Sequence, residues 1–419
     1  MSKPKITTIT LGCRFNSVES EMIKIIAGQT NDPTPIVIIN TCAVTHEAER
    51  QSKQAVRKAI RENKGSKIVV TGCAAKTAKE YFENLEGISE VVQNDGKEPV
   101  DISQIIAGPL HLFDGRARAF LQIQNGCDHF CTYCIVPFTR GRSRSLPPEL
   151  ILNQVEYFLH HGFNEIVLSG IDIASYGKDF NEMGYDLSAI IEAILERTHI
   201  AGTRIRLSSI DPAAVSQNLL SLFTGEPRIM PYFHFSIQSG SNEVLMAMRR
   251  RHSREDVITI CEHIRRQRKE VVIGGDLIAG FPVETELMFE ESVRLIDDAG
   301  LSLIHVFPFS SRNGTVAAQM VKLPPNVIRF RASILQEKTQ AAKKALFQSL
   351  IGSTTSGLIE KSDGVVAFGK TDSYIPFRLV GPFRVGEVVH SISIAGICEE
   401  NSELMLICML DPNNLSLIP

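Results

Sequence analysis

Three cysteines with the spacing C-x3-C-x2-C occur in the first third of the 419-residue chain, at Cys127, Cys131 and Cys134. A structural zinc site takes four ligands, and a 4Fe–4S cluster that only carries electrons takes four cysteines. His129 lies between them, but its position suits a tight zinc site poorly. The three thiols therefore favour a 4Fe–4S cluster with one open iron, where a substrate or cofactor binds. Structural zinc is the less favoured alternative.

A second set of three cysteines follows short β-branched segments near the N-terminus. Cys13, Cys42 and Cys73 end the runs "KITTITLGC", "PIVIINTC" and "SKIVVTGC". Ligands of an open parallel sheet bind at the carboxyl ends of its strands, so these thiols converge if their strands are neighbours. A single cysteine there is ordinarily a small core hydrophobe. Three cysteines at the same strand-end position favour a ligand set.

The elements that must position these cysteines predict an α/β protein of three domains. Residues 1–110 repeat a strand–helix pattern, which predicts an open parallel α/β domain joined by a connector at about 94–118. Residues 115–350 contain six strand segments that alternate with helices. Because eight such units close a full barrel, six predict a partial (β/α)6 barrel with an open side for a large substrate. Residues 353–419 contain five short strands without helices, which predicts a small antiparallel barrel of the OB type.

The composition is that of an ordinary globular protein, with 43% hydrophobic and 22% charged residues. No apolar run is long enough to span a bilayer, and the N-terminal residues lack a signal-peptide core, so we expect a cytoplasmic protein without a membrane partner. In a reducing compartment, nine cysteines favour metal binding or catalysis over disulfides. The net charge of −3 means that nucleic acid must be bound by local basic patches.

The central cysteine motif, with Tyr133 before its last cysteine, resembles the radical S-adenosylmethionine (SAM) superfamily. The resemblance implies that the open iron chelates the amino and carboxylate groups of SAM. It also implies that the reduced cluster splits the sulfonium to give a 5′-deoxyadenosyl radical, while the protein orients the reactants and excludes water.

The whole chain resembles the methylthiotransferase family, because both cysteine sets and a C-terminal barrel similar to a TRAM domain occur together. The segments "LGCRFNSVESE", "NTCAVTHEAERQSKQAVRK" and "RRRHSRED" are most similar to the branch that modifies threonylcarbamoyladenosine beside the tRNA anticodon. This implies a methylthio group inserted at C2 of the adenine. It further implies a second 4Fe–4S cluster on Cys13, Cys42 and Cys73 whose open iron carries the sulfur. An electron donor such as flavodoxin or ferredoxin is then required.

Two enzyme alternatives keep this chemistry and change the target to isopentenyladenosine in tRNA or to an aspartate of a ribosomal protein. A third alternative is a protein without catalysis, either a two-cluster electron carrier or a zinc-stabilised RNA-binding module. Four-cysteine sets would favour that third alternative, and the sequence contains none with that spacing.

The segment "YFHFSIQSG" alternates, which puts His234, Ser236 and Gln238 on one face and the phenylalanines on the other. In a barrel the polar face turns into the lumen. The family resemblance makes Ser236 and Gln238 candidates for binding the ribose and methionyl parts of SAM. A polar core network is the alternative for His234.

Three further residues are candidates for SAM contacts. Arg206 could pair with the SAM carboxylate, and an ion pair with a neighbouring strand is the alternative. Gly274 and Gly275 could lie near the SAM adenine, as the family resemblance implies, or they could allow tight packing between strands.

Three basic patches follow strand ends and are candidates for contacts with tRNA phosphates. The C-terminal barrel differs from them, because residues 353–419 contain four Lys and Arg against eight Asp and Glu, which puts phosphate binding by this barrel in doubt. The patches are a helical stripe (Arg50, Lys53, Arg57, Arg61, Lys64), a group after the cysteine motif (Arg140, Arg142, Arg144) and a third group (Arg249, Arg250, Arg251, Arg254).

Overall fold

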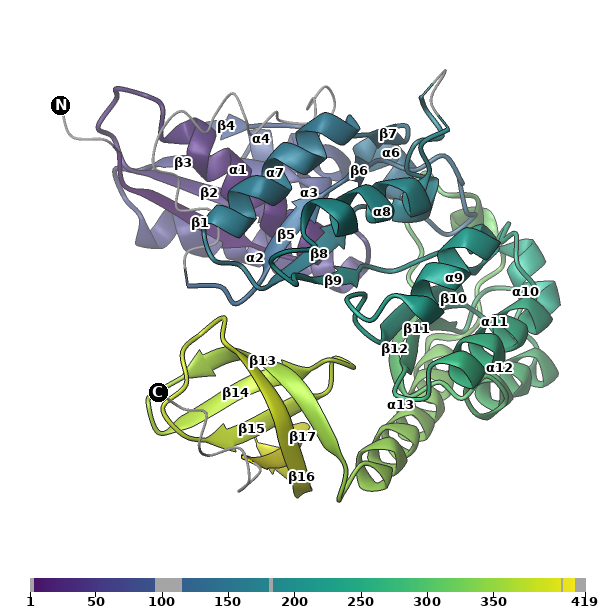
Figure 1. Ribbon diagram of the computed structural model, residues 1–419. Helices are drawn as coiled ribbons and strands as arrows, with labels where there is room; N and C mark the ends of the chain where they lie inside the picture. The colour runs from purple at the N-terminus through teal and green to yellow at the C-terminus, as the bar shows by residue number, and fades with distance from the viewer. Residues whose placement is uncertain (1–3, 95–114, 181–183, 401, 411–419) are drawn as a thin grey trace.

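The computed structural model describes residues 4–94, 115–180, 184–400 and 402–410. Most of the predicted connector, including the boundary at residue 110, lies outside these ranges. The chain forms an N-terminal sheet, a central set of six parallel strands and a closed C-terminal barrel, and a long helix leads into the barrel (Figure 1). The three predicted kinds of architecture are therefore confirmed. No helix in the described part of the chain is long and apolar enough to cross a membrane.

The N-terminal sheet is parallel, and its strands follow one another in the order β1-β2-β3-β4. The three cysteine-bearing strand ends therefore lie side by side, which is the condition that the sequence left open. The strands are β1 (Ile6–Thr10), β2 (Ile36–Thr41), β3 (Lys67–Gly72) and β4 (Glu90–Val91). The helices are α1 (Arg14–Ala27), α2 (His46–Glu62), α3 (Cys73–Thr77) and α4 (Lys79–Glu83).

Helix α2 begins where the Cys42 loop ends. The Thr45 side chain accepts a hydrogen bond from the amide of Ala48, which satisfies one of the free amides of the first turn. Ser52, Val56 and Ala59 form the buried face. This spacing of three and four leaves the basic residues on the outer face.

The central strands are parallel and form a partial barrel. Two three-stranded sheets, β5-β8-β9 and β10-β11-β12, are joined by single bridges that pair Ile205 with Ile229 and Ile210 with Phe235. Among the described residues β12 pairs only with β11, so the barrel is open between β12 and β5. The strands are β5 (Ala119–Gln122), β8 (Glu165–Ser169), β9 (Arg204–Leu207), β10 (Tyr232–Gln238), β11 (Val272–Ala279) and β12 (Leu303–Pro308).

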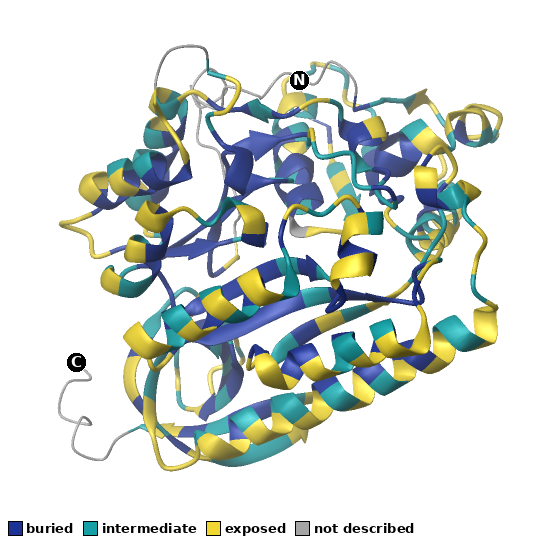
Figure 2. Ribbon diagram, turned by 90° about the vertical axis from the view of Figure 1, so that its right-hand side faces the viewer, coloured by how far each residue is buried: buried dark blue, intermediate teal, exposed yellow. Residues whose placement is uncertain are grey.

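Helices cover the outside of these strands, with their exposed sides turned outward (Figure 2). Phe233 of β10 stacks on Phe223 of α9 with ring centroids 4.2 Å apart, so the phenylalanine face of β10 meets the helices as predicted. The helices are α6 (Val136–Arg140), α7 (Pro148–His160), α8 (Leu187–Arg197), α9 (Gln217–Gly225), α10 (Asn242–Ala247), α11 (Arg254–Gln267), α12 (Glu286–Asp298) and α13 (Pro325–Ser349). Short elements are β6 (Gln124–Asn125), β7 (Arg144–Ser145), η1 (Ile173–Ser175), η2 (Pro212–Ala214) and η3 (Val316–Gln319).

The C-terminal barrel packs against the N-terminal ends of the central strands. Tyr374 of the barrel stacks on Tyr232 at the start of β10, with centroids 5.2 Å apart, and Val272 at the start of β11 joins the same apolar cluster. Because the cysteine motif follows the first central strand at its other end, the barrel lies away from the cysteines. Its strands close in the order β13-β14-β15-β17-β16. They are β13 (Thr354–Ser362), β14 (Val366–Thr371), β15 (Pro376–Val380), β16 (Val388–Glu400) and β17 (Glu403–Leu410).

Candidate active site

A cavity of about 290 Å³ lies at the carboxyl ends of the central strands. The three central cysteines open onto it, and so do residues from two other parts of the chain, Val44 and Thr45 of the Cys42 loop and Ser310 after β12. The structure thus brings together most of the site predicted for this region. The predicted residues that line the cavity are Cys127, Cys131, Cys134, Tyr133, Ser236 and Gln238.

Burial controls the protonation of the central thiols. It raises the pKa of Cys127 to about 12, helped by the nearby Asp172 carboxylate, and it raises the pKa of Cys134 to about 12 as well. Such thiols stay protonated near neutral pH unless a positive centre replaces their protons. Three of them share one cavity, and no fourth cysteine among the described residues lines it. This donor set fits a cluster held by three thiolates.

The N-terminal cysteines converge because glycines let their loops approach. Gly12 has φ +88°, and a Cβ atom there would lie 2.7 Å from the Sγ of Cys42. Cys42 and Cys73 are buried, and burial raises the pKa of Cys42 to about 11, with the nearby Cys73 and Cys13 adding to the rise. The Asn94 amide lies 4.0 Å from the Sγ of Cys73.

Arg140 links the two cysteine regions and corrects one sequence prediction. Its guanidinium is buried and pairs with Glu19 at 2.8 Å and with the side-chain oxygen of Asn16 at 2.6 Å, both on α1. Burial opposes its charge, but Cys73 and Glu19 raise the pKa of Arg140 above its ordinary value. A buried, paired arginine cannot bind tRNA phosphates. It instead supplies positive charge beside Cys13 and Cys73, which suits a set of thiolates.

We expect Arg140→Met to destabilise the iron-free protein by about 3–5 kcal/mol, because Glu19 would be left buried without its cation. The double variant Arg140→Met, Glu19→Met should recover much of this loss. The measurement is the free energy of unfolding in urea. A single variant within about 1 kcal/mol of wild type would contradict a structural role for this pair.

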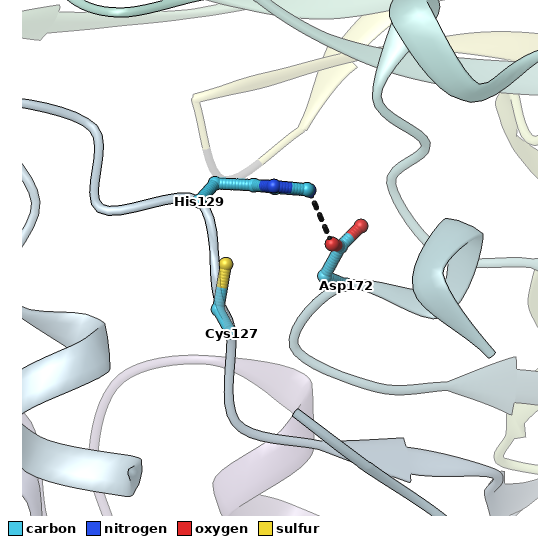
Figure 3. A group of neighbouring side chains, drawn as sticks. All are labelled: Cys127, His129 and Asp172. Atoms are coloured by element: carbon cyan, nitrogen blue, oxygen red, sulfur yellow. Dashed lines mark ion pairs between the residues drawn. The ribbon is translucent and has the colours of Figure 1, made fainter. Parts of the chain in front are cut away.

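Sequence analysis did not identify Asp172, which braces the cysteine loop through His129. His129 and Asp172 point toward each other beside the Cys127 thiol (Figure 3), with Nε2 2.6 Å from the carboxylate. Asp172 follows β8 by three residues, so the strand-end rule that selected the cysteines could have found it. The Asp172 carboxylate also accepts a hydrogen bond from Ser175 at 2.6 Å.

Arg250 connects the loop to the central strands. It pairs with Asp211 at 3.1 Å and donates to the Cys131 Sγ at 3.7 Å and to the Ser236 carbonyl at 2.5 Å. Burial opposes ionisation of Asp211, but the nearby His252 ring, 3.5 Å away, and the charge of Arg250 hold its pKa well below the usual range. Arg250 is therefore a buried brace of the cavity, and its predicted place in an RNA-binding patch is wrong.

The end of β10 is distorted where it meets the cavity. Gln238 has φ +79°, and the pairing of β10 with β11 shifts register between Phe235 and Gln238. A left-handed conformation is strained for a residue with a side chain, and such strain concentrates at functional sites. Ser236 and Gln238, on either side of this distortion, both line the cavity.

Three predicted SAM-contact residues do not line the cavity. Arg206 is buried near the opposite ends of the strands, where it pairs with Glu165 at 2.8 Å and donates to the Asp372 carbonyl at 3.1 Å. The alternative of an ion pair with a neighbouring strand therefore describes Arg206. Gly274 and Gly275 correspond to the packing alternative, since a Cβ atom would lie 2.3 Å from the Leu303 carbonyl and 2.8 Å from Ile237, respectively.

The exposed basic residues are fewer than the sequence suggested. Arg254 donates to the carbonyls of Gly240 and Glu291 at 3.2 Å and 2.7 Å, so it joins loop and helix. Arg142 is exposed and lies 3.1 Å from Asp128. The predicted helical stripe keeps most of its members exposed, but α2 ends at Glu62, so Lys64 lies just beyond the helix.

Two family models match the chain. Residues 121–296 match the Radical SAM superfamily, and residues 5–93 match the uncharacterized protein family UPF0004. The chain is also similar to a solved structure, the radical S-adenosylmethionine methyltransferase TsrM from Kitasatospora setae with tryptophan and a SAM analogue bound. That likeness has a TM-score of 0.52 and 12% identity, covers 78% of this chain and 81% of the other, and concerns the fold alone.

Curated relatives match nearly the whole chain. The threonylcarbamoyladenosine tRNA methylthiotransferase MtaB of Rickettsia prowazekii (strain Madrid E) is 38% identical, over 95% of this chain and 97% of that protein. The protein of the same name from Aquifex aeolicus (strain VF5) is 32% identical, over 92% and 99%. A tRNA-2-methylthio-N(6)-dimethylallyladenosine synthase of Staphylococcus aureus (strain Newman) is 30% identical, over 87% and 77%. The chain therefore belongs to the threonylcarbamoyladenosine tRNA methylthiotransferase family of radical SAM proteins.

Proposed function

We infer that the protein is an enzyme that inserts a methylthio group at C2 of N6-threonylcarbamoyladenosine, next to the anticodon of tRNA. The observation that carries this inference is the cavity itself. Its walls include three cysteines of the central strands and two residues, Val44 and Thr45, that directly follow Cys42. A base held there would face the central cysteines and lie beside the loop that carries Cys42, although the N-terminal cysteines themselves do not line the cavity.

The residues fit two clusters and SAM. Cys127, Cys131 and Cys134 would hold one 4Fe–4S cluster, and the N-terminal set of Cys13, Cys42 and Cys73 would hold the other. When bound, these groups and SAM supply the 5′-deoxyadenosyl radical and the sulfur that is inserted.

The chain's own residues bind, orient and shield the reactants. Tyr133, Ser236 and Gln238 line the cavity and would orient SAM by contact with its methionyl and ribose parts. Arg250 keeps the cysteine loop against β10, because it donates hydrogen bonds to the Cys131 Sγ and to the Ser236 carbonyl. Its ion pair with Asp211 is nine-tenths buried and holds the guanidinium in place. A cavity walled on several sides limits the access of water to a reactive radical.

We assign residues 1–110 to the methylthiotransferase domain, 115–350 to the radical-SAM core and 353–419 to the TRAM-like barrel. The reaction requires an external one-electron donor, for which flavodoxin or ferredoxin is suitable, and we place it in the cytoplasm. The position of the C-terminal barrel at the far ends of the central strands favours packing as its role. The N-terminal domain, whose Cys42 loop borders the cavity, is the better candidate for contacts with tRNA.

The α2 stripe is the proposed tRNA contact. Its first members are neutralised by their neighbours, because Arg50 pairs with Glu47 and Lys53 with Glu49, both at 2.7 Å. Farther along, Arg57, Arg61 and Lys64 are exposed. The net positive charge of the stripe therefore lies in this second half.

Changing Arg57, Arg61 and Lys64 together to Glu should weaken tRNA binding and flatten its salt dependence. Each lost phosphate contact lowers the slope of log K against log salt by about 0.7–0.9, so the three should lower it by about 2–3. The control reverses three exposed arginines on outer helices, Arg197, Arg266 and Arg294. An equal slope for both triple variants would mean that the stripe is only a solvated helix face.

The test of the proposed function is mass spectrometry of tRNA nucleosides from cells that lack the protein. The methylthio form of threonylcarbamoyladenosine should disappear, and unmodified threonylcarbamoyladenosine should accumulate. Expression of the wild-type chain in these cells should restore the methylthio form. Loss of methylthio-isopentenyladenosine, or of the ribosomal-protein modification, would favour one of the two alternative targets instead.

A further inference from the structure

A second polar cluster lies on three adjacent central strands. Asp276 of β11 lies between two histidines, with its Oδ1 2.9 Å from Nε2 of His234 on β10 and 3.3 Å from Nδ1 of His305 on β12. The Tyr232 hydroxyl is 2.9 Å from the other ring nitrogen of His234. The roles proposed above for the cavity use none of these side chains.

The cluster reaches the floor of the cavity through Asp276, and its two histidines lie next to Asp276 on the neighbouring strands. Asp276 itself lines the cavity. Side chains two positions apart on a strand share a face, and each cluster residue precedes a cavity-lining residue by two positions. The pairs are His234 with Ser236, Asp276 with Ile278, and His305 with Phe307. A group that passes the central cysteines and moves down the lumen therefore meets these polar atoms.

Gly274 and the hydrogen bonds of Asp276 hold these side chains in place. Gly274 is the register partner of His234, and a Cβ atom at Gly274 would lie 2.7 Å from the Tyr232 hydroxyl and 3.2 Å from the His234 ring. Burial opposes ionisation of Asp276, but the hydrogen bonds to His234 and His305 hold its pKa well below the usual range. The floor of the cavity thus presents a carboxylate.

His305 is the accessible member of the cluster. Its side chain is 63% exposed, on the strand that borders the open side of the barrel. Its Nδ1 faces Asp276, and Nε2 forms no hydrogen bond within the described part of the chain. By contrast, both ring nitrogens of His234 are engaged, so His234 positions Asp276 and is not offered to a ligand.

We propose that Asp276 and His305 form the subsite for the polar N6 substituent of the substrate adenine, with His234 and Tyr232 as positioning residues. This inference rests on the proposed function. A threonylcarbamoyl group offers N–H donors, which suit the Asp276 carboxylate, and a hydroxyl donor, which suits His305 Nε2 because Nδ1 already donates to Asp276. The substrate carboxylate would point past the exposed His305 ring toward solvent, away from Asp276, which limits repulsion between the two anions.

The same subsite disfavours an apolar substituent. A dimethylallyl group cannot form these hydrogen bonds, so it would leave Asp276 and His305 desolvated without partners. Sites built to hydrogen-bond a substrate reject analogues that lack the polar group by large factors. Because the His305 side chain is largely exposed, it loses little hydration when a ligand binds. We therefore expect a smaller ratio, about 10–100, between the affinities for the polar and the apolar substituent.

The experiment compares the affinity of the cluster-loaded protein, without reductant, for two tRNAs of the same sequence. One carries threonylcarbamoyladenosine beside the anticodon, and the other carries plain adenosine there. Wild type should prefer the modified tRNA about 10-fold to 100-fold. His305→Phe and Asp276→Asn should reduce this preference to within about 3-fold, while His305→Gln, which keeps a hydrogen-bond acceptor, should retain part of it.

The control is His199→Phe, which changes an exposed histidine after α8 and should keep the full preference. Retention of the preference in both His305→Phe and Asp276→Asn would overturn the subsite. The three ligand atoms also lie within 4.8 Å of one another, as a metal site requires. Stoichiometric binding of Zn²⁺ by wild type that is lost in His305→Phe would assign a metal site in place of the subsite.

A methylthiolation assay of the reduced wild-type enzyme distinguishes failure of the subsite from failure of the proposed function. If wild type does not methylthiolate the threonylcarbamoyl tRNA, the proposed function itself fails. If it does so and the two variants keep wild-type preference, only the subsite fails.

Discussion

Replacing any one of Cys127, Cys131 or Cys134 with Ala is expected to abolish reductive cleavage of SAM. Two thiolates cannot hold a cluster that leaves one defined iron open, and no fourth cysteine among the described residues lines this cavity to replace the lost ligand. The measurement is the yield of 5′-deoxyadenosine from anaerobically reconstituted, reduced protein. We expect a loss of at least about 1,000-fold, since the other cysteine set of the described residues is assigned to sulfur insertion and not to SAM cleavage.

The matched control is Cys398→Ala, which removes a partly buried thiol from β16 of the C-terminal barrel. This variant should keep the wild-type iron content and deoxyadenosine yield. Deoxyadenosine formation at the wild-type level in any of the three loop variants would refute the assignment of the loop.

Replacing Cys13, Cys42 and Cys73 together with Ala should separate the two activities of the enzyme. The N-terminal set lies on a different sheet from the central cysteines, so the loop and its cavity should survive the change. The variant should lose about half of its iron, from about eight atoms to about four per chain. It should still cleave SAM, but it should form no methylthiolated nucleoside.

Iron content, deoxyadenosine and modified tRNA nucleosides are measured on the same preparation. Cys261→Ala, which removes a buried thiol of α11, controls for loss of a cysteine from a core. If the triple variant still methylthiolates tRNA, the N-terminal cysteines are core thiols and do not carry sulfur. Loss of both activities would instead indicate that the sets depend on each other, and Arg140, which reaches from α6 to α1, is the contact that would transmit this dependence.

The sequence by itself determined the elements of this protein and the ends at which its cysteines lie. Strand segments were recognisable because β-branched runs alternate with helical periodicity, and these patterns depend only on residues close in the chain. The six central strands and the five barrel strands occur where the sequence predicts them. Alternation on β10 also predicted that Ser236 and Gln238 face the lumen, and both line the cavity.

The tertiary structure decided which of the charged residues face solvent and which face each other. Arg140 and Arg250 look like members of basic patches in the sequence, but their partners Glu19 and Asp211 lie 121 and 39 residues away along the chain. Arg206 belongs to the strand ends covered by the C-terminal barrel, where its partners include the Asp372 carbonyl 166 residues away.

The side chains around Asp276 show why the sequence determines some features and the tertiary structure others. His234, Asp276 and His305 each follow the local rule that places them on an inward face, but their meeting depends on the order and register of β10, β11 and β12. Register is set by the packing of whole strands and by a glycine that makes room opposite His234. Local periodicity therefore gives the direction of a side chain, and only the assembled sheet decides which side chains it meets.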